Sequence, residues 1–130
     1  MKILVGYDPP YHNSALLQRT ILDARAYDAY VYLVTSFQDG REATPDVVDS
    51  AQEALNKAMA ILRGENILCE SHVLVRNTTP GEDIVAFAME NDVDEIIVHA
   101  KKKSKVGKVI TGSNAQHIIL NAHCTVLTVK

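Results

Sequence analysis

The sequence predicts a single α/β domain, spanning residues 1–130, in which a doubly wound, five-stranded parallel sheet carries helices on both faces. Five short runs of β-branched and aliphatic residues alternate with four segments of helical periodicity. The first and fourth runs are almost continuously apolar, which is typical of parallel strands covered on both faces. The connections are short and no linker or internal repeat divides the chain, so right-handed crossovers within one domain are expected.

The third expected strand differs from the others in its polarity. It combines Glu70 and His72 with Val73 and Val75, a mixture that favours the edge of a sheet over its centre. We expect the five strands at residues 2–7, 30–36, 67–75, 95–99 and 125–129.

The first two helices are expected at residues 13–27 and 45–64. Thr44 can cap the second helix, and Pro45 follows at the first turn, where its missing N–H is tolerated. Apolar residues at helical spacing give each helix one buried face. These residues are Leu17, Ile21 and Ala24 in the first helix and Val47, Ala51, Leu55, Ala58 and Leu62 in the second.

The third and fourth helices each begin with a pattern typical of a capping box, in which a hydroxyl side chain caps and a Glu or Gln follows three residues later. Thr79 and Glu82 form the first pair, and Ser113 and Gln116 form the second. Residues 100–112, before the fourth helix, are expected to be an irregular loop long enough to indicate a function. The fourth helix is expected to bury Ala115, Ile118, Ile119 and Ala122.

Charge is distributed unevenly along the chain. The net charge is −3, yet five of the 13 basic residues lie in one short stretch without an acid. The rest of the chain carries eight basic and 16 acidic residues, a balance that argues against general nucleic-acid binding. The basic stretch could instead receive one compact anion. Its lysines are Lys101, Lys102, Lys103, Lys105 and Lys108.

Cysteine content and hydropathy predict the compartment. Cys69 and Cys124 are far apart in sequence and have no metal-type spacing, which suits a reducing environment. No apolar run approaches the roughly 20 residues needed to span a bilayer, and no secretory signal pattern precedes the first strand. We therefore expect a cytoplasmic protein without a membrane partner.

Two features follow expected strands at their carboxyl ends, where ligands bind in open α/β sheets. Asp8 ends the first strand, and the lysine-rich stretch follows the fourth. Gly112 and Ser113 then open a helix, whose free N–H groups and dipole favour phosphate. If the first and fourth strands are neighbours, these features face one crevice.

The chain resembles the universal stress protein family along essentially its whole length. The resemblance is carried by the opening Ile-Leu-Val-Gly-Tyr-Asp at 3–8, the helix-to-strand passage at 80–94, and the segment from residue 95 through Gly112-Ser113 to residue 130. It implies an adenine nucleotide alpha hydrolase-like fold with strand order 3-2-1-4-5. It also implies a homodimer formed through residues 124–130, and a stress-response regulator that binds AMP or ATP without evident turnover.

Family members that hold ATP carry Gly-x-x-Gly, nine residues, then Gly-Ser or Gly-Thr. Here His99 and Lys102 occupy the first two glycine positions, so the glycine-rich loop is degenerate and a mono- or diphosphate fits it better than a triphosphate. The resemblance implies that Asp8 meets the adenosine part and that Ser36 lies where a small apolar residue often lines the adenine pocket. The other residues that we expect to bind the nucleotide are His99, Ala100, Lys101, Lys102, Lys103, Gly112, Ser113 and Asn114, with the lysines replacing the lost glycines by charge.

Three other interpretations compete with this one. A dimeric interaction module of the same family that binds no nucleotide is favoured by the missing glycines, and very weak ATP hydrolysis stays open. A phosphoacceptor receiver domain is excluded, because Asp8 stands alone after the first strand and Arg76-Asn77 follows the third. No Walker A or Gly-x-Ser-x-Gly motif and no metal-type histidine spacing occurs, so we predict no catalytic residue, no metal and no required cofactor.

Overall fold

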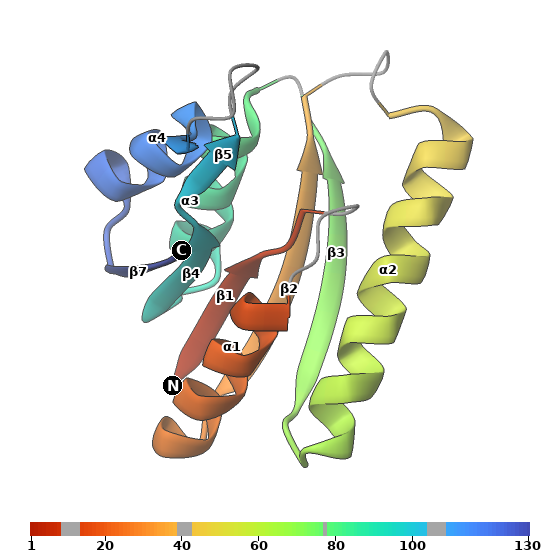
Figure 1. The fold of residues 1–130 in the computed structure, drawn as a ribbon, viewed down its shortest axis with the longest axis vertical. Helices are drawn as coiled ribbons and strands as arrows, with labels where there is room; N and C mark the ends of the chain where they lie inside the picture. The colour runs from red at the N-terminus through yellow and green to blue at the C-terminus, as the bar shows by residue number, and fades with distance from the viewer. Residues whose placement is uncertain (9–13, 39–42, 77, 104–108) are drawn as a thin grey trace.

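The computed structural model describes residues 1–8, 14–38, 43–76, 78–103 and 109–130 (Figure 1). For residues 101–103 and 109–111 the description is confined to the backbone. Five parallel strands form the main sheet in the order β3-β2-β1-β4-β7, which confirms the predicted 3-2-1-4-5 order and the edge position of the third strand. The strands are β1 (Lys2–Gly6), β2 (Tyr30–Phe37), β3 (Cys69–Val75), β4 (Glu95–His99) and β7 (Thr125–Val129).

Four helices cover the two faces of this sheet, as Figure 1 shows. On one face, α1 and α2 pack on a core that contains Ile3, Leu33 and Leu55. On the other, α3 and α4 enclose a second core around Leu4 and Phe87. The two cores exist because consecutive strand residues point to opposite faces, and both faces are apolar. The helices are α1 (Ser14–Tyr27), α2 (Pro45–Gly64), α3 (Pro80–Glu90) and α4 (Ser113–Asn121).

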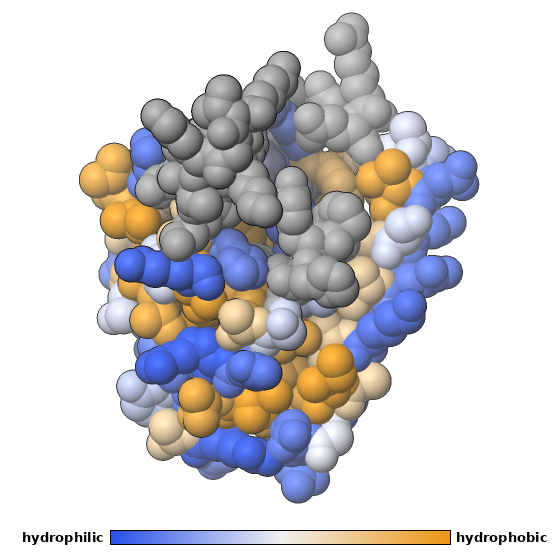
Figure 2. Space-filling model, in the orientation of Figure 1, coloured by the Kyte–Doolittle hydropathy of each residue, from blue (hydrophilic) through white to orange (hydrophobic). Residues whose placement is uncertain are grey.

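The face that carries α1 and α2 is shown in space-filling form in Figure 2, where hydrophobic residues lie between hydrophilic ones. Two of its apolar side chains, Leu22 on α1 and Ile61 on α2, are at least half exposed. Scattered apolar exposure of this kind is ordinary for a folded protein. In the part of the chain that the structure describes, no helix has both the length and the apolarity to cross a bilayer.

The capping signals of α2 and α3 are confirmed. The Thr44 hydroxyl accepts the N–H of Val47 at 3.4 Å, and the Thr79 hydroxyl accepts that of Glu82 at 3.3 Å. The Thr79 hydroxyl also donates to the Glu82 carboxylate at 2.9 Å, so the two side chains of the predicted box do meet. Val47, by contrast, is 40% exposed although its spacing predicted burial.

The predicted capping box of α4 is wrong. Gly112 is the N-cap, in extended conformation and without a side-chain cap, and Ser113 is the first helical residue. The reason is that the Gly112 carbonyl already accepts the first helical bond, from the N–H of Gln116 at 3.0 Å. Ala115 and Ile118 are buried as predicted, whereas Ile119 is 47% exposed because the helix turns it away from the core.

Residues 100–112 were expected to be irregular, and this expectation is wrong for residues 101–103 and 109–111. The strands β5 (Lys101–Lys103) and β6 (Val109–Thr111) pair antiparallel, with Lys101 opposite Thr111. Consecutive β-branched residues in the second strand favour this extended pairing. Between them, residues 104–108 lie outside the described part of the chain.

Candidate functional site

The candidate site is a pocket of about 160 Å³ at the carboxyl ends of the central strands. It exists because β1 lies directly beside β4, with Val5 opposite Ile97, at the point where the winding of the sheet reverses. Its lining comes from β1, β2, β4, α3 and α4. The lining residues are Gly6, Tyr7, Asp8, Val34, Ser36, Pro80, Ile84, Val98, His99, Asn114, Ala115 and Ile118.

Four of the predicted site residues meet in this pocket: Asp8, Ser36, His99 and Asn114. Each comes from a different segment, so the fold alone brings them together. Ala100, Gly112 and Ser113 adjoin the lining in sequence without being part of it. The side chains of Lys101, Lys102 and Lys103 lie outside the described residues, so the role expected for them stays a prediction.

Gly6 keeps the floor of the pocket open. A Cβ atom built at this position would lie only 2.9 Å from Cγ1 of Val98, a distance that real Cβ atoms essentially never show. Val98 is β-branched and therefore stiff at χ1, so it could not easily give way. The glycine at the end of β1 thus permits close packing of β1 on β4 and leaves space in the pocket.

Asp8 and His99 are ionisable residues that line the pocket. Desolvation raises the pKa of the Asp8 carboxyl above its ordinary value, and the nearby His99 opposes part of that rise. Asp8 as a whole nevertheless remains exposed, so water still reaches the residue. The Nε2 atom of His99 is buried and has no hydrogen-bond partner within the described chain, which leaves one polar atom for a ligand to satisfy.

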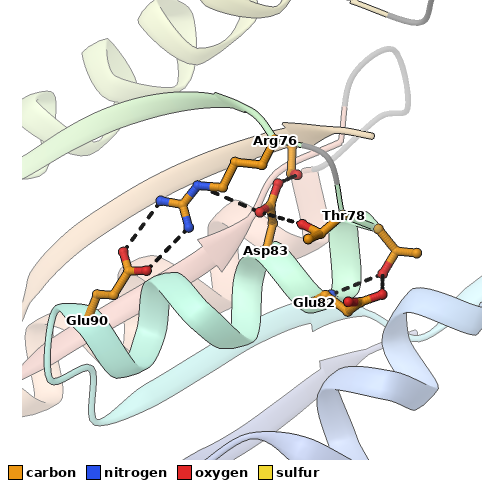
Figure 3. A network of polar contacts seen from close by, with 7 residues as sticks. Arg76, Thr78, Glu82, Asp83 and Glu90 are labelled. Atoms are coloured by element: carbon orange, nitrogen blue, oxygen red, sulfur yellow. Dashed lines mark hydrogen bonds and ion pairs between the residues drawn. The ribbon is translucent and has the colours of Figure 1, made fainter. Parts of the chain in front are cut away.

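The opposite side of the pocket is held by a polar network around Asp83, shown in Figure 3. Asp83 is only 1% exposed. Its Oδ2 accepts the Ser36 hydroxyl at 2.5 Å, and its Oδ1 accepts the Thr78 hydroxyl at 2.9 Å. The Arg76 guanidinium approaches Oδ1 at 3.7 Å and also reaches the Glu90 carboxylate at 3.3 Å. The network therefore fixes the Ser36 side chain.

Asp83 was missed by the sequence analysis. The available signal was its position on α3: it shares the buried helix face with Ile84 and Phe87, where an acid requires partners. Its partners come from β2 and from the turn after β3, so sequence spacing did not reveal them.

Asn114 ties α4 to α3 at the edge of the pocket. Its side-chain Oδ1 accepts the backbone N–H of Gly81 at 2.9 Å. That N–H belongs to the first turn of α3, where no helical acceptor exists. A Cβ at Gly81 would come within 3.1 Å of the Asn114 carbonyl oxygen, so the glycine lets the two helices approach.

A larger and more open depression, of about 640 Å³, lies at the amino ends of β4 and β7. It is lined by Asp92, Val93, Asp94, His123, Cys124 and Thr125. No predicted site residue contributes to it, and parallel sheets bind ligands at the opposite end. Among the described residues there is no cluster of three or more His, Cys, Asp or Glu suited to a metal ion. We therefore take the smaller pocket as the site.

Comparison with known proteins identifies the family. The protein-family model described as "Universal stress protein family" matches residues 1–130. The chain belongs to the universal stress protein family. A universal stress protein of Methanocaldococcus jannaschii is 30% identical over 114 residues, a match that covers 83% of this chain and 66% of that relative's length.

Two solved structures from Archaeoglobus fulgidus are similar to this universal stress protein chain over their whole length. One is a universal stress protein with 36% identity and a TM-score of 0.89, covering 100% of this chain and 98% of the other. The second is a universal stress protein in complex with dAMP, with 31% identity and a TM-score of 0.83 over the same shares. The adenine nucleotide alpha hydrolase-like fold implied by the sequence is thus confirmed.

Proposed function

We propose that this universal stress protein binds an adenine nucleotide in the pocket at the carboxyl ends of β1, β2 and β4. The observation that carries the proposal is the convergence of Asp8, Ser36, His99 and Asn114 on one pocket from four segments. The Archaeoglobus relative in complex with dAMP supports the ligand class. At about 160 Å³ the pocket suits the base, and the ribose and phosphates would extend toward the start of α4 and the lysine-rich segment.

The polar groups of the pocket have complementary roles in this proposal. Asp8 accepts hydrogen bonds from the ribose or base, and the buried Nε2 of His99 gains a partner from the ligand. The apolar side chains of Val34, Ile84 and Val98 pack on the faces of the base.

The proposed role is regulatory, in the stress response of a cytoplasmic protein, and includes no turnover. The sequence contains neither a Walker A motif nor a nucleophile elbow to supply it. We further propose a homodimer through β7. This strand ends the sheet order, and the neighbouring α4 exposes 80% of Leu120 and 47% of Ile119.

Binding is tested by mass spectrometry of nucleotide released from denatured protein, followed by calorimetric titration with AMP and ATP. The Asp8→Asn variant should lose about tenfold or more in affinity, since a hydrogen bond to a charged group contributes roughly 1.5–3 kcal/mol. Asp46→Asn, on the exposed first turn of α2, is the matched control and should bind as the parent does. A parent protein that binds neither nucleotide at millimolar concentration would refute the proposal.

A second candidate function is a dimeric interaction module that binds no nucleotide. It is favoured by His99 and Lys102 at the positions where ATP-holding relatives carry glycines. A stable dimer in sedimentation, together with no released nucleotide, would support it over the first proposal.

A further inference from the structure

The hydroxyl group of Ser36 has its single proton directed away from the pocket. Ser36 Oγ lies 2.5 Å from Asp83 Oδ2, and an ionised carboxylate can only accept hydrogen bonds. The serine therefore donates to Asp83. Since Ser36 also lines the pocket, its oxygen faces the ligand space as a hydrogen-bond acceptor only.

Asp83 is held so that this arrangement does not depend on a ligand. Its second oxygen accepts the Thr78 hydroxyl and faces the Arg76 guanidinium, which is itself braced by Glu90 (Figure 3). The carboxylate lies in the first turn of α3, where the helix dipole favours negative charge. Both oxygens are thus occupied, and Ser36 Oγ is oriented before binding.

The neighbouring backbone carbonyls already accept hydrogen bonds within the sheet. The Val34 carbonyl accepts the N–H of Tyr7 at 2.9 Å, and the Tyr7 carbonyl accepts the Thr35 hydroxyl at 2.6 Å. At the end of β2, the side-chain oxygen of Ser36 is thus an acceptor that these sheet hydrogen bonds do not occupy and that a ligand in the pocket could use. The resemblance to the family implies that a small apolar residue often stands at this position, and such a side chain would offer no hydrogen-bond acceptor.

We propose that Ser36 is a specificity-determining residue that selects a 6-aminopurine over a 6-oxopurine, with Asp83 as its positioning residue. The inference rests on the proposed nucleotide function and deepens it. The amino group of adenine donates a hydrogen bond to Ser36 Oγ. The 6-oxo group of hypoxanthine or guanine would instead bring a second acceptor against Ser36, with no proton between them, a mismatch that rejects the wrong base.

The test compares calorimetric affinities for ATP and ITP, whose bases differ at position 6, amino against oxo, and in the proton that hypoxanthine carries on N1. The parent protein should prefer ATP by about tenfold or more, as expected when a buried polar group loses its partner. In Ser36→Ala the ratio of the two affinities should fall toward one, chiefly through weaker ATP binding. Ser36→Thr keeps the hydroxyl and should retain the preference.

Asp83→Asn tests the positioning role through the same ratio. Arg76 favours the amide oxygen on its own side, so the amide NH₂ faces Ser36 and donates to it. The serine proton then points into the pocket, and ITP should gain relative to ATP. Ser71→Ala, a serine-to-alanine change on β3 outside the pocket lining, controls for effects on the sheet.

The outcomes separate the inference from the proposed function. Equal binding of ATP and ITP by the parent, or an unchanged ratio in Ser36→Ala, overturns the role of Ser36 while nucleotide binding stands. Failure of the parent to bind AMP, ATP or ITP overturns both. A reduced ratio in Ser36→Ala with retention in Ser36→Thr supports the inference even if Asp83→Asn does not fold.

Discussion

A buried pair of carboxyl groups should make the stability of the protein fall as the pH rises. Glu95 begins β4 and Asp23 lies on α1, and each residue is only 6% exposed. Asp23 lies close enough to Glu95 to raise its pKa, while Arg19 pairs with Asp23 at 3.1 Å. Burial is the main cause that raises the pKa of Glu95 from 4.5 to about 7. The neighbouring Asp23 adds to this rise, and Arg19 opposes it.

The sign and size of the effect follow from the two pKa values of Glu95. Between pH 4.5 and pH 7 the folded protein retains a proton that the unfolded chain has released. The stabilisation is complete below about pH 4.5 and is lost as the pH rises through about 7. At 1.36 kcal/mol per pKa unit, the total loss is about 3 kcal/mol, most of it between pH 5 and pH 8.

Glu95→Gln removes this titration while preserving the shape of the side chain. The variant should match the parent most closely near pH 5 and become more stable by about 3 kcal/mol at pH 9. At the usual unfolding entropy per residue, the melting temperatures should separate by roughly 10 °C. Circular dichroism melts at pH 5 to 9 measure the difference directly, because groups that titrate alike in both proteins cancel.

Glu53→Gln is the matched control, since Glu53 is an exposed acid on α2. Its melting temperature should follow that of the parent across the whole pH range. If the gap between Glu95→Gln and the parent were the same at pH 5 and pH 9, Glu95 would titrate normally and the reasoning from burial would be refuted.

Three further substitutions test the packing and capping. Gly6→Ala forces a Cβ against Val98, so we expect a loss of about 1–3 kcal/mol in urea unfolding, together with weaker nucleotide binding. Gly64→Ala, where a new Cβ meets nothing within 4 Å, should leave stability equal or slightly higher, and similar losses in both variants would contradict this explanation. Thr44→Ala removes the α2 cap and should reduce the free energy of unfolding by about 1 kcal/mol, whereas Thr44→Ser should restore it. Leu33→Ala, in the fully buried core, should lower the free energy of unfolding by about 2–5 kcal/mol, and a loss below 1 kcal/mol would show that the core repacks.

Local patterns in the sequence were sufficient to predict the four helices, the five strands of the main sheet and their order along the chain, although they missed the short β5–β6 pair. The starts of α2 and α3 were predicted because a capping residue and a following proline act within one helical turn. The central strands were predicted because both of their faces are apolar, and the polar residues of β3 correctly indicated an edge. Asp8 was predicted as a site residue because it directly follows a buried strand.

What the sequence left undecided depends on contacts between distant segments. Ser36 and Asp83 are 47 residues apart, and only the packing of α3 beside β2 brings the hydroxyl to the carboxylate. The pairing of Asp23 with Glu95 likewise requires α1 to lie across β4. The N-cap of α4 is Gly112, one residue before the predicted Ser113, and no side chain caps this helix. The Gly112 carbonyl accepts the first helical hydrogen bond, from the N–H of Gln116.

The sequence alone therefore determined the fold class, the family resemblance and the end of the sheet at which we propose that a ligand binds. These follow from periodicity and from the general geometry of parallel sheets. The tertiary structure decided which polar groups face one another and which of them are desolvated by burial. Hydrogen-bond direction and burial are properties of assembled elements, so the orientation of the Ser36 hydroxyl and the raised pKa of Glu95 arise only in the folded protein.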